Sequence, residues 1–234
     1  MITLTQIKQF LNISPDESSK DELLKNFISN AVSELNTLCS RTLEYSSQIE
    51  IISGTGGITL VLENYPAVSI DRIDVLLDDA WCNLFNLPDT FSDSAILLKE
   101  VGIIKLLKSY IFPKGELNIK VSYSSGYKCA DDWKPGADYL VDVLVKYNGS
   151  IYKCIEEHTS GEEFDELKWE IDPAKPVPEA LAKAVMYLAA KQFYLSPAGK
   201  NMFMKSSESY GDKQTDYNDI DISHIVHTHR NTNI

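Results

Sequence analysis

A change in hydrophobic period near residue 48 is the feature that most constrains how this chain can fold. Before that point, apolar residues recur every three or four positions, as they do on one face of an α-helix. From Gln48 onward, apolar positions alternate with polar ones, as they do in a strand with one buried face. Helices followed by a run of strands predict an α+β fold.

Two helices are predicted before the change of period. Thr3 or Thr5 can cap the first helix, and Ser18 or Ser19 can cap the second, which starts near Lys20. Acidic residues at positions 21 and 22 suit the positive end of a helix dipole. The second helix carries the clearest apolar stripe in the chain, formed by Leu23, Phe27, Ala31, Leu35 and Leu38.

A small antiparallel sheet is predicted in the middle of the chain. Ile49 and Ile51 precede the glycine-rich stretch 54–57, and Leu60 and Leu62 follow it, which predicts a hairpin. Further strands are predicted over residues 68–77, 96–107 and 117–123, with a loop over residues 78–95.

A segment rich in aromatic and acidic residues interrupts this domain, and Tyr147-Asn148-Gly149 within it predicts a hairpin turn. A strong helix with Pro178 in its first turn follows, and the polar tail after it has few apolar anchors. We therefore predict four segments: a host domain over 1–129, an inserted all-β module over 130–172, the last long helix over 173–204, and an extended C-terminal arm over 205–234.

The charge of the chain limits its partners. A formal net charge of -12 argues against non-specific binding to the phosphate backbone of nucleic acids, which requires clustered Lys and Arg. Neither a secretory signal nor an apolar run of about 18 residues is present, so no membrane partner is expected. The four cysteines form no C-x-x-C pair, and we expect them to stay reduced in the cytosol.

Sequence patterns that can indicate an enzyme are explained here by a hairpin, a polar tail and a charged loop. The glycines at 54–57 lie in a predicted hairpin rather than between a strand and a helix, which excludes a phosphate-binding loop. His224, His227 and His229 belong to a polar tail, and the acidic residues at 162–166 belong to a charged loop. We therefore predict a non-enzyme with no catalytic residue, no cofactor and no metal.

Several motifs, in order, resemble the head–tail connector family of tailed bacteriophages. The opening residues 3–11 are similar to the first helix of that family, and Leu23-Leu24-x-x-Phe27-Ile28-x-x-Ala31 to its second. The stretch 60–69, the segment Val121–Tyr127 and the stretch starting at Val177-Pro178 are similar to later parts. The last two segments are nearly adjacent in the sequences of the family but are some fifty residues apart here. We therefore predict an insertion between them.

The resemblance implies a structural virion protein at the head–tail junction, assembled in the host cytoplasm. It implies a ring of about twelve identical subunits below the portal. Further partners would be the portal protein and the tail or the next connector or stopper, while DNA passes through the lumen without specific binding. We expect apolar residues of the arm to dock on these partners, namely Tyr210, Tyr217, Ile222 and Ile225.

The insert is similar to small chitin-binding-type carbohydrate-binding modules, in which sugar rings stack on exposed aromatic side chains. The residues that would bind a glycan are Trp133, Tyr152 and Trp169. The same rings can equally form the core of so small a module, which has few other large apolar groups to bury. The glycan-binding interpretation leads to an alternative function, a carbohydrate-binding adhesin or decoration protein of the virion.

Overall fold

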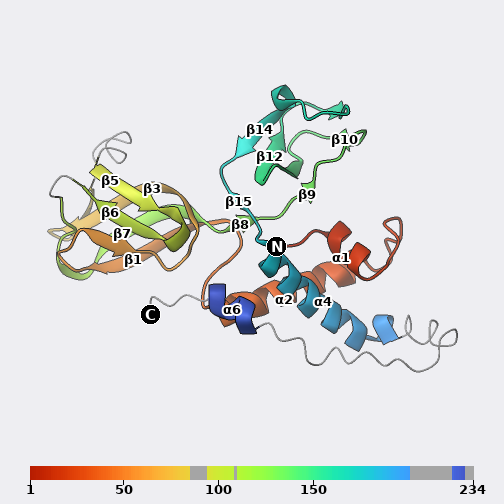
Figure 1. Ribbon diagram of the computed structural model, residues 1–234. Coiled ribbons are helices and arrows are strands. Elements are labelled where there is room, and N and C mark those ends of the chain that lie inside the picture. Colours follow the sequence, from red (N-terminus) through yellow and green to blue (C-terminus); the bar gives the residue numbers. More distant parts are fainter. Residues whose placement is uncertain (85–93, 108–109, 201–222, 230–234) are drawn as a thin grey trace. The chain divides into compact units, whose positions relative to one another are not determined.

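A computed structural model of the chain describes residues 1–84, 94–107, 110–200 and 223–229. These residues form two compact units. The first unit contains the described parts of residues 1–40, 129–171 and 176–230, and the second contains those of 41–128 and 172–175 (Figure 1). The chain leaves the second unit after Lys128 and returns to it at Asp172.

The first unit contains four described helices, α1 (Leu4–Phe10), α2 (Asp21–Cys39), α4 (Glu179–Leu195) and α6 (Ser223–His229). Thr3, one of the two residues predicted to cap α1, caps it through a reciprocal pair of hydrogen bonds with Gln6. The prediction of Ser18 or Ser19 as the cap of α2 is wrong, because Lys20 occupies that position without a side-chain hydrogen bond. The carboxylate of Asp21 instead pairs with the buried ammonium of Lys8, 2.6 Å away.

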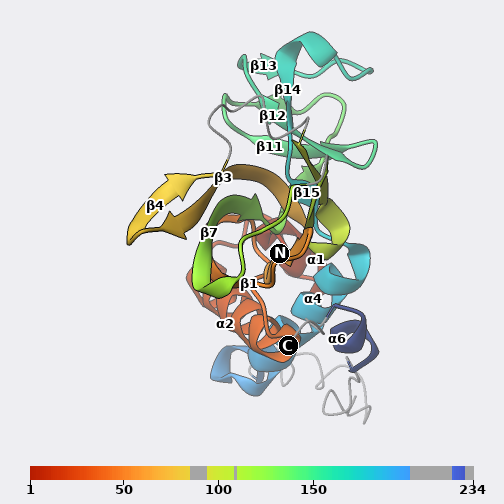
Figure 2. The same cartoon turned by 90° about the vertical axis from the view of Figure 1, so that its left-hand side faces the viewer.

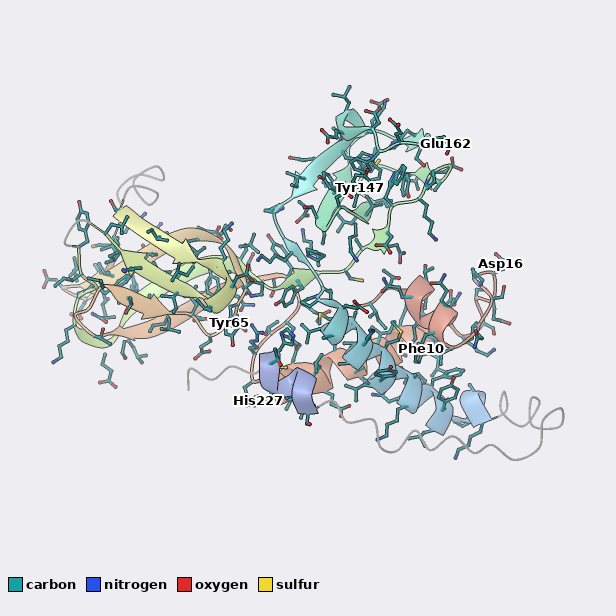
Figure 3. All side chains as sticks on the ribbon, viewed as in Figure 1. Phe10, Asp16, Tyr65, Tyr147, Glu162 and His227 are labelled. Carbon is teal, nitrogen blue, oxygen red and sulfur yellow. The ribbon has the colours of Figure 1, made fainter. Side chains whose placement is uncertain are left out.

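Helix α4 runs along α2 in the opposite direction (Figure 1). Apolar faces of both helices are buried, as their sequence periodicity predicts, and Leu38 is the member of the predicted stripe that stays exposed. The fully or almost fully buried side chains are Leu24, Ala31, Val32, Leu35 and Cys39 on α2, and Leu181, Ala184, Val185, Ala189, Ala190 and Phe193 on α4. Phe10, labelled in Figure 3, extends this packing through an edge contact with Tyr187 at 5.6 Å.

The second unit contains two antiparallel sheets. One has the strand order β1 (Ser46–Gly54), β7 (Gly115–Ser125), β3 (Ala67–Leu77) and β4 (Ala80–Asn83), all labelled in Figure 2. The other has the order β2 (Thr59–Val61), β6 (Ile103–Leu106) and β5 (Ala95–Leu98), with a short 3-10 helix η1 (Lys99–Val101) between β5 and β6.

The predicted hairpin around residues 54–57 does not form. Strand β1 pairs with β7 and strand β2 pairs with β6, so the chain passes from one sheet to the other at this point. Gly54 allows the crossing because its backbone lies so close to that of Pro113 that a Cβ atom would be 1.8 Å from the Pro113 carbonyl oxygen. Its N–H donates to the Asn118 side chain at 2.8 Å, which fixes the end of the strand.

The predicted strand over 68–77 is present as β3 and contains irregularities in its register with β7. The predicted strand over 96–107 is instead the β5–β6 hairpin. The core between the strands of this unit consists of Leu60, Leu62, Ala67, Ile73, Val75, Ala95, Ile104, Leu106, Phe112, Ile119, Val121 and Tyr123.

A polar network closes one end of this core. The Glu50 carboxylate accepts hydrogen bonds from the backbone N–H of Glu63 at 3.0 Å, from the Asn64 side chain at 3.2 Å and from the Tyr123 hydroxyl. The Tyr123 hydroxyl also accepts from the Asn64 N–H at 3.2 Å. The Glu50 carboxylate is half-buried, and several donors satisfy it without a cationic partner, so this network can order the 62–65 turn against β7.

The residues of the inserted module form a small sheet with the order β14 (Trp169–Asp172), β12 (Ser150–Cys154), β11 (Leu144–Tyr147) and β9 (Asp131–Asp132). A second pair consists of β10 (Asp138–Tyr139) and β13 (His158–Thr159), and a 3-10 helix, η2 (Glu166–Lys168), precedes β14. The hairpin predicted at Asn148-Gly149 is confirmed, because Tyr147 pairs with Ser150 and both turn residues have positive φ.

Two short strands, β8 (Tyr127–Lys128) and β15 (Lys175–Pro176), pair where the chain departs toward the module and returns from it. The Lys128 ammonium pairs with the Asp172 carboxylate at 2.6 Å and lies 4.3 Å above the Tyr45 ring. The departing and returning segments are therefore fastened to each other by both backbone and side chains.

The Glu50 network predicts a loss of stability at alkaline pH. Burial and the hydrogen bond to Glu50 raise the pKa of Tyr123 well above its ordinary value. Because the folded protein holds this proton more tightly than the unfolded chain does, the stabilisation is complete below pH ~10 and declines as the pH rises further. Urea unfolding across this range should give a shallower decline for Tyr123→Phe than for the wild type, and equal slopes would contradict the assignment.

Candidate interaction surfaces

The inserted module is held together by a cluster of aromatic rings with Phe164 at its centre. Phe164 stacks on Tyr147 with ring centroids 4.1 Å apart and on Trp169 at 5.4 Å. Trp133 and Tyr152 contact Phe164 edge-on, at 5.7 and 5.0 Å. Figure 3 labels Tyr147 within this cluster. Phe164 was not among the residues predicted to bind a glycan, although its aromatic character in an aromatic-rich insert was the available signal.

The three residues predicted to bind a glycan differ in their surroundings. Trp169 is only 6% exposed and belongs to the buried core of the module, where Tyr139 contacts it edge-on at 5.0 Å. Trp133 and Tyr152 are half-buried and pack against that core. Trp169 therefore contributes to the packing of the module, while parts of the other two rings remain accessible.

The orientation of the rings does not provide a flat platform from the two tryptophans. Trp169 lies within 20° of the Phe164 plane, whereas Trp133 is inclined at 80° to it, so the two indole planes are far from parallel. Stacking of successive sugar rings requires roughly coplanar, exposed faces. The indole N–H groups of Trp133 and Trp169 are buried and have no acceptor within the part of the chain that the structure describes.

Among the predicted anchors of the C-terminal arm, Tyr210, Tyr217 and Ile222 lie outside the described residues. Ile225 falls in helix α6, which packs near α2 and α4 within the first unit, but its side chain is likewise outside the description.

The acidic residues that suggested enzyme chemistry lie at the surface of the module. Glu162, Glu163 and Glu166 are exposed, and Asp165 uses its carboxylate to cap η2, accepting from the Leu167 N–H at 3.1 Å. Among the described residues, no three His, Cys, Asp or Glu side chains are grouped so that they could hold a metal ion. None of the described helices is long and apolar enough to cross a membrane.

Comparison with known families identifies two parts of the chain. Residues 1–62 match the model of the phage gp6-like head-tail connector protein family, and residues 132–166 match carbohydrate-binding module family 5/12. Both predicted resemblances are therefore confirmed over these ranges. No curated protein matches the chain.

A solved structure shares the fold. A chain from the neck of an empty GTA particle, computed with C6 symmetry, superimposes with a TM-score of 0.53 and 10% identity, covering 99% of this chain and 90% of that one. A chain from the neck of a native GTA particle, computed with C12 symmetry, gives a TM-score of 0.49 and 9% identity, covering 99% and 89%. The first likeness indicates a shared overall fold of mixed helices and small antiparallel sheets.

The ring cluster predicts which residues stabilise the module. Phe164→Ala should lower its free energy of unfolding by about 3–4 kcal/mol, because the ring contacts four others. Leu167→Ala, at a nearby side chain that is 85% exposed, is the matched control and should change it by less than about 0.5 kcal/mol. Tryptophan fluorescence during urea unfolding measures both, in a Trp81→Phe background that leaves only the two indoles of the module. Similar effects for the two variants would refute a central role of Phe164.

Proposed function

We propose that the chain is a structural virion protein, a head–tail connector subunit that forms a ring under the portal and joins the capsid to the tail. The match of residues 1–62 to the connector family carries this proposal. The shared fold supports it, because the likeness to a chain from a particle neck extends over 99% of this chain. In this proposal the chain has no catalytic role and needs no cofactor.

The proposed ring contains about twelve copies, as the resemblance to the connector family implies. A closed cyclic assembly of this kind repeats one contact between two different surfaces of the same chain. The six-fold symmetry used for the neck with the shared fold is compatible with that number. The ring would line the exit channel for DNA. A net charge of -12 fits this role, because a wall without clustered Lys and Arg releases DNA rather than retaining it.

Electron microscopy of virions tests the proposal directly. We expect density for a closed ring containing this chain between the portal and the tail, with the inserted module as a separate feature of each subunit. Immunogold labelling against residues 130–172 gives an independent position for the chain. Finding the chain on fibres or on the capsid surface, and not at the portal vertex, would overturn the connector proposal.

That outcome would favour the second candidate, a carbohydrate-binding adhesin or decoration protein. The observation in its favour is the match of residues 132–166 to a carbohydrate-binding module family, together with the partly accessible rings of Trp133 and Tyr152. The burial of Trp169 weighs against it, because one of the three expected contact rings is used for packing.

The C-terminal arm is proposed to anchor the subunit on its partners through Tyr210, Tyr217, Ile222 and Ile225. A chain that ends at Lys205 should lose its association with the portal protein in a pull-down with purified portal. A gentler variant, Tyr210→Ala with Tyr217→Ala, should weaken the association, whereas the polar control Asn218→Ala should leave it unchanged. Docking of the truncated chain with unaltered affinity would exclude the arm as the anchor.

A further inference from the structure

The outer face of the β2–β6–β5 sheet is apolar and exposed. Val61 pairs with Ile103, and Ile103 pairs with Leu98, so these three side chains stand side by side across the sheet. Leu98 is 46% exposed and Val61 is 40% exposed, while the residues that alternate with them, such as Ile104, are buried in the core. Ile96 and Val101 add two further exposed aliphatic side chains. We refer to these five residues as the outer sheet face.

The charge beside the outer sheet face is positive. Lys105 pairs across the sheet with Ile96, and Lys99 directly follows Leu98; both lysines are exposed. In the described part of the chain neither lysine takes part in an ion pair, whereas the neighbouring Glu100 is neutralised by Lys175. The face therefore combines an apolar centre with two lysines at its rim, and protein–protein interfaces commonly pair an apolar centre with a polar rim.

A second exposed aliphatic surface lies on the inserted module. It consists of Leu140, Val141, Val143, Ile155 and Leu167, all of which are exposed. Backbone hydrogen bonds place the segments that carry these residues next to one another: the Cys154 N–H donates to the Val143 carbonyl at 2.9 Å, and the Ile155 N–H donates to the Lys168 carbonyl at 3.0 Å. We refer to these five residues as the module patch.

Acidic residues surround the module patch. Asp142, Glu156 and Glu166 directly adjoin its members in the sequence, Glu157 follows one position further on, and all four are exposed. Two of them are already paired, Asp142 with Lys153 and Glu156 with Lys168. Residues 129–171 as a whole contain eleven acidic and four basic residues, so they carry most of the net negative charge of the chain. The module patch is thus the electrostatic counterpart of the outer sheet face.

We propose that the module patch of one copy docks on the outer sheet face of a neighbouring copy, and that this contact joins adjacent subunits of the ring. The inference rests on the proposed connector function. A head-to-tail contact needs two different, complementary surfaces on one chain, and these two surfaces complement each other in both apolar character and charge. Docking removes from water aliphatic side chains that are exposed in the single chain.

The chemistry of the module patch excludes the other classes of ligand at this place. A glycan is recognised by exposed aromatic faces, but the rings of the module gather around Phe164, and the patch itself is aliphatic. A nucleic acid is repelled by the acidic residues that surround it. An apolar protein surface with a positive rim is the partner that this patch fits.

Cysteine cross-linking between two variants tests the contact on the full chain. One variant carries Leu167→Cys and the other Leu98→Cys, both in a background in which Cys82 and Cys129 are replaced by Ser. Mixing the two purified variants with a short bismaleimide should give a cross-linked dimer that contains one copy of each. The matched control replaces Leu98→Cys with Ile49→Cys, an exposed aliphatic position on β1. Its yield should be lower on the order of tenfold if the contact is specific.

Surface variants provide a second measurement. Adding Lys105→Glu to the Leu98→Cys partner should reduce the cross-linked yield about fivefold, whereas Lys114→Glu, the same charge change at another exposed lysine, should leave it unchanged. Circular dichroism verifies that each variant is folded. Equal yields for the test and control cysteine pairs, or equal effects of the two charge reversals, would overturn the proposed contact.

Electron microscopy separates this inference from the function on which it rests. Closed rings at the portal vertex without the Leu98–Leu167 cross-link would refute the contact and leave the connector function standing. Absence of this chain from the portal vertex would refute the connector function and, with it, the ring contact. Rings with the cross-link would support both.

Discussion

The second unit depends on the pairing of strand β7 with two strands that come much earlier in the chain. Residues 115–125 pair with β1 on one side and with β3 on the other, and they contribute Ile119, Val121 and Tyr123 to the core. Both neighbours must find their register on this one strand before the core can close. Tyr123 also carries the hydroxyl that ties Glu50 and the 62–65 turn to β7. Long-range pairings of this kind are entropically costly to form, which makes β7 the element that completes the unit.

Local features of the sequence predicted local structure well. The α2 and α4 helices follow from the spacing of their apolar residues, and the Asn148-Gly149 turn follows from the preference of these two residues for positive φ. Such features are decided by a few neighbouring residues. The cap of α2 is an exception, because neither Ser18 nor Ser19 occupies it. Asp21 in the first turn pairs with Lys8 on another helix, and the sequence around Ser18 and Ser19 does not indicate such a long-range contact.

The sequence pattern could not predict which strands pair with each other. Alternation of apolar residues indicates which face of a strand is buried, but it does not indicate which strand lies beside that strand. The glycines at 54–57 therefore suggested a hairpin, whereas Gly54 is needed for the close approach to Pro113 as the chain changes sheets. The aromatic insert posed the same difficulty. Its composition identified the rings, but only their geometry distinguishes Trp169 in the core from Trp133 and Tyr152 near the surface.

The pairing of β8 with β15 has a consequence for how this protein can diverge. The two strands join the start and the end of the predicted insertion, and Lys128 and Asp172 form an ion pair beside them. A segment whose ends meet in this way can be exchanged, lengthened or lost in evolution while the chain on either side keeps its path. The predicted insertion could therefore be replaced by another segment whose ends lie equally close together, without a change in the path of the flanking chain.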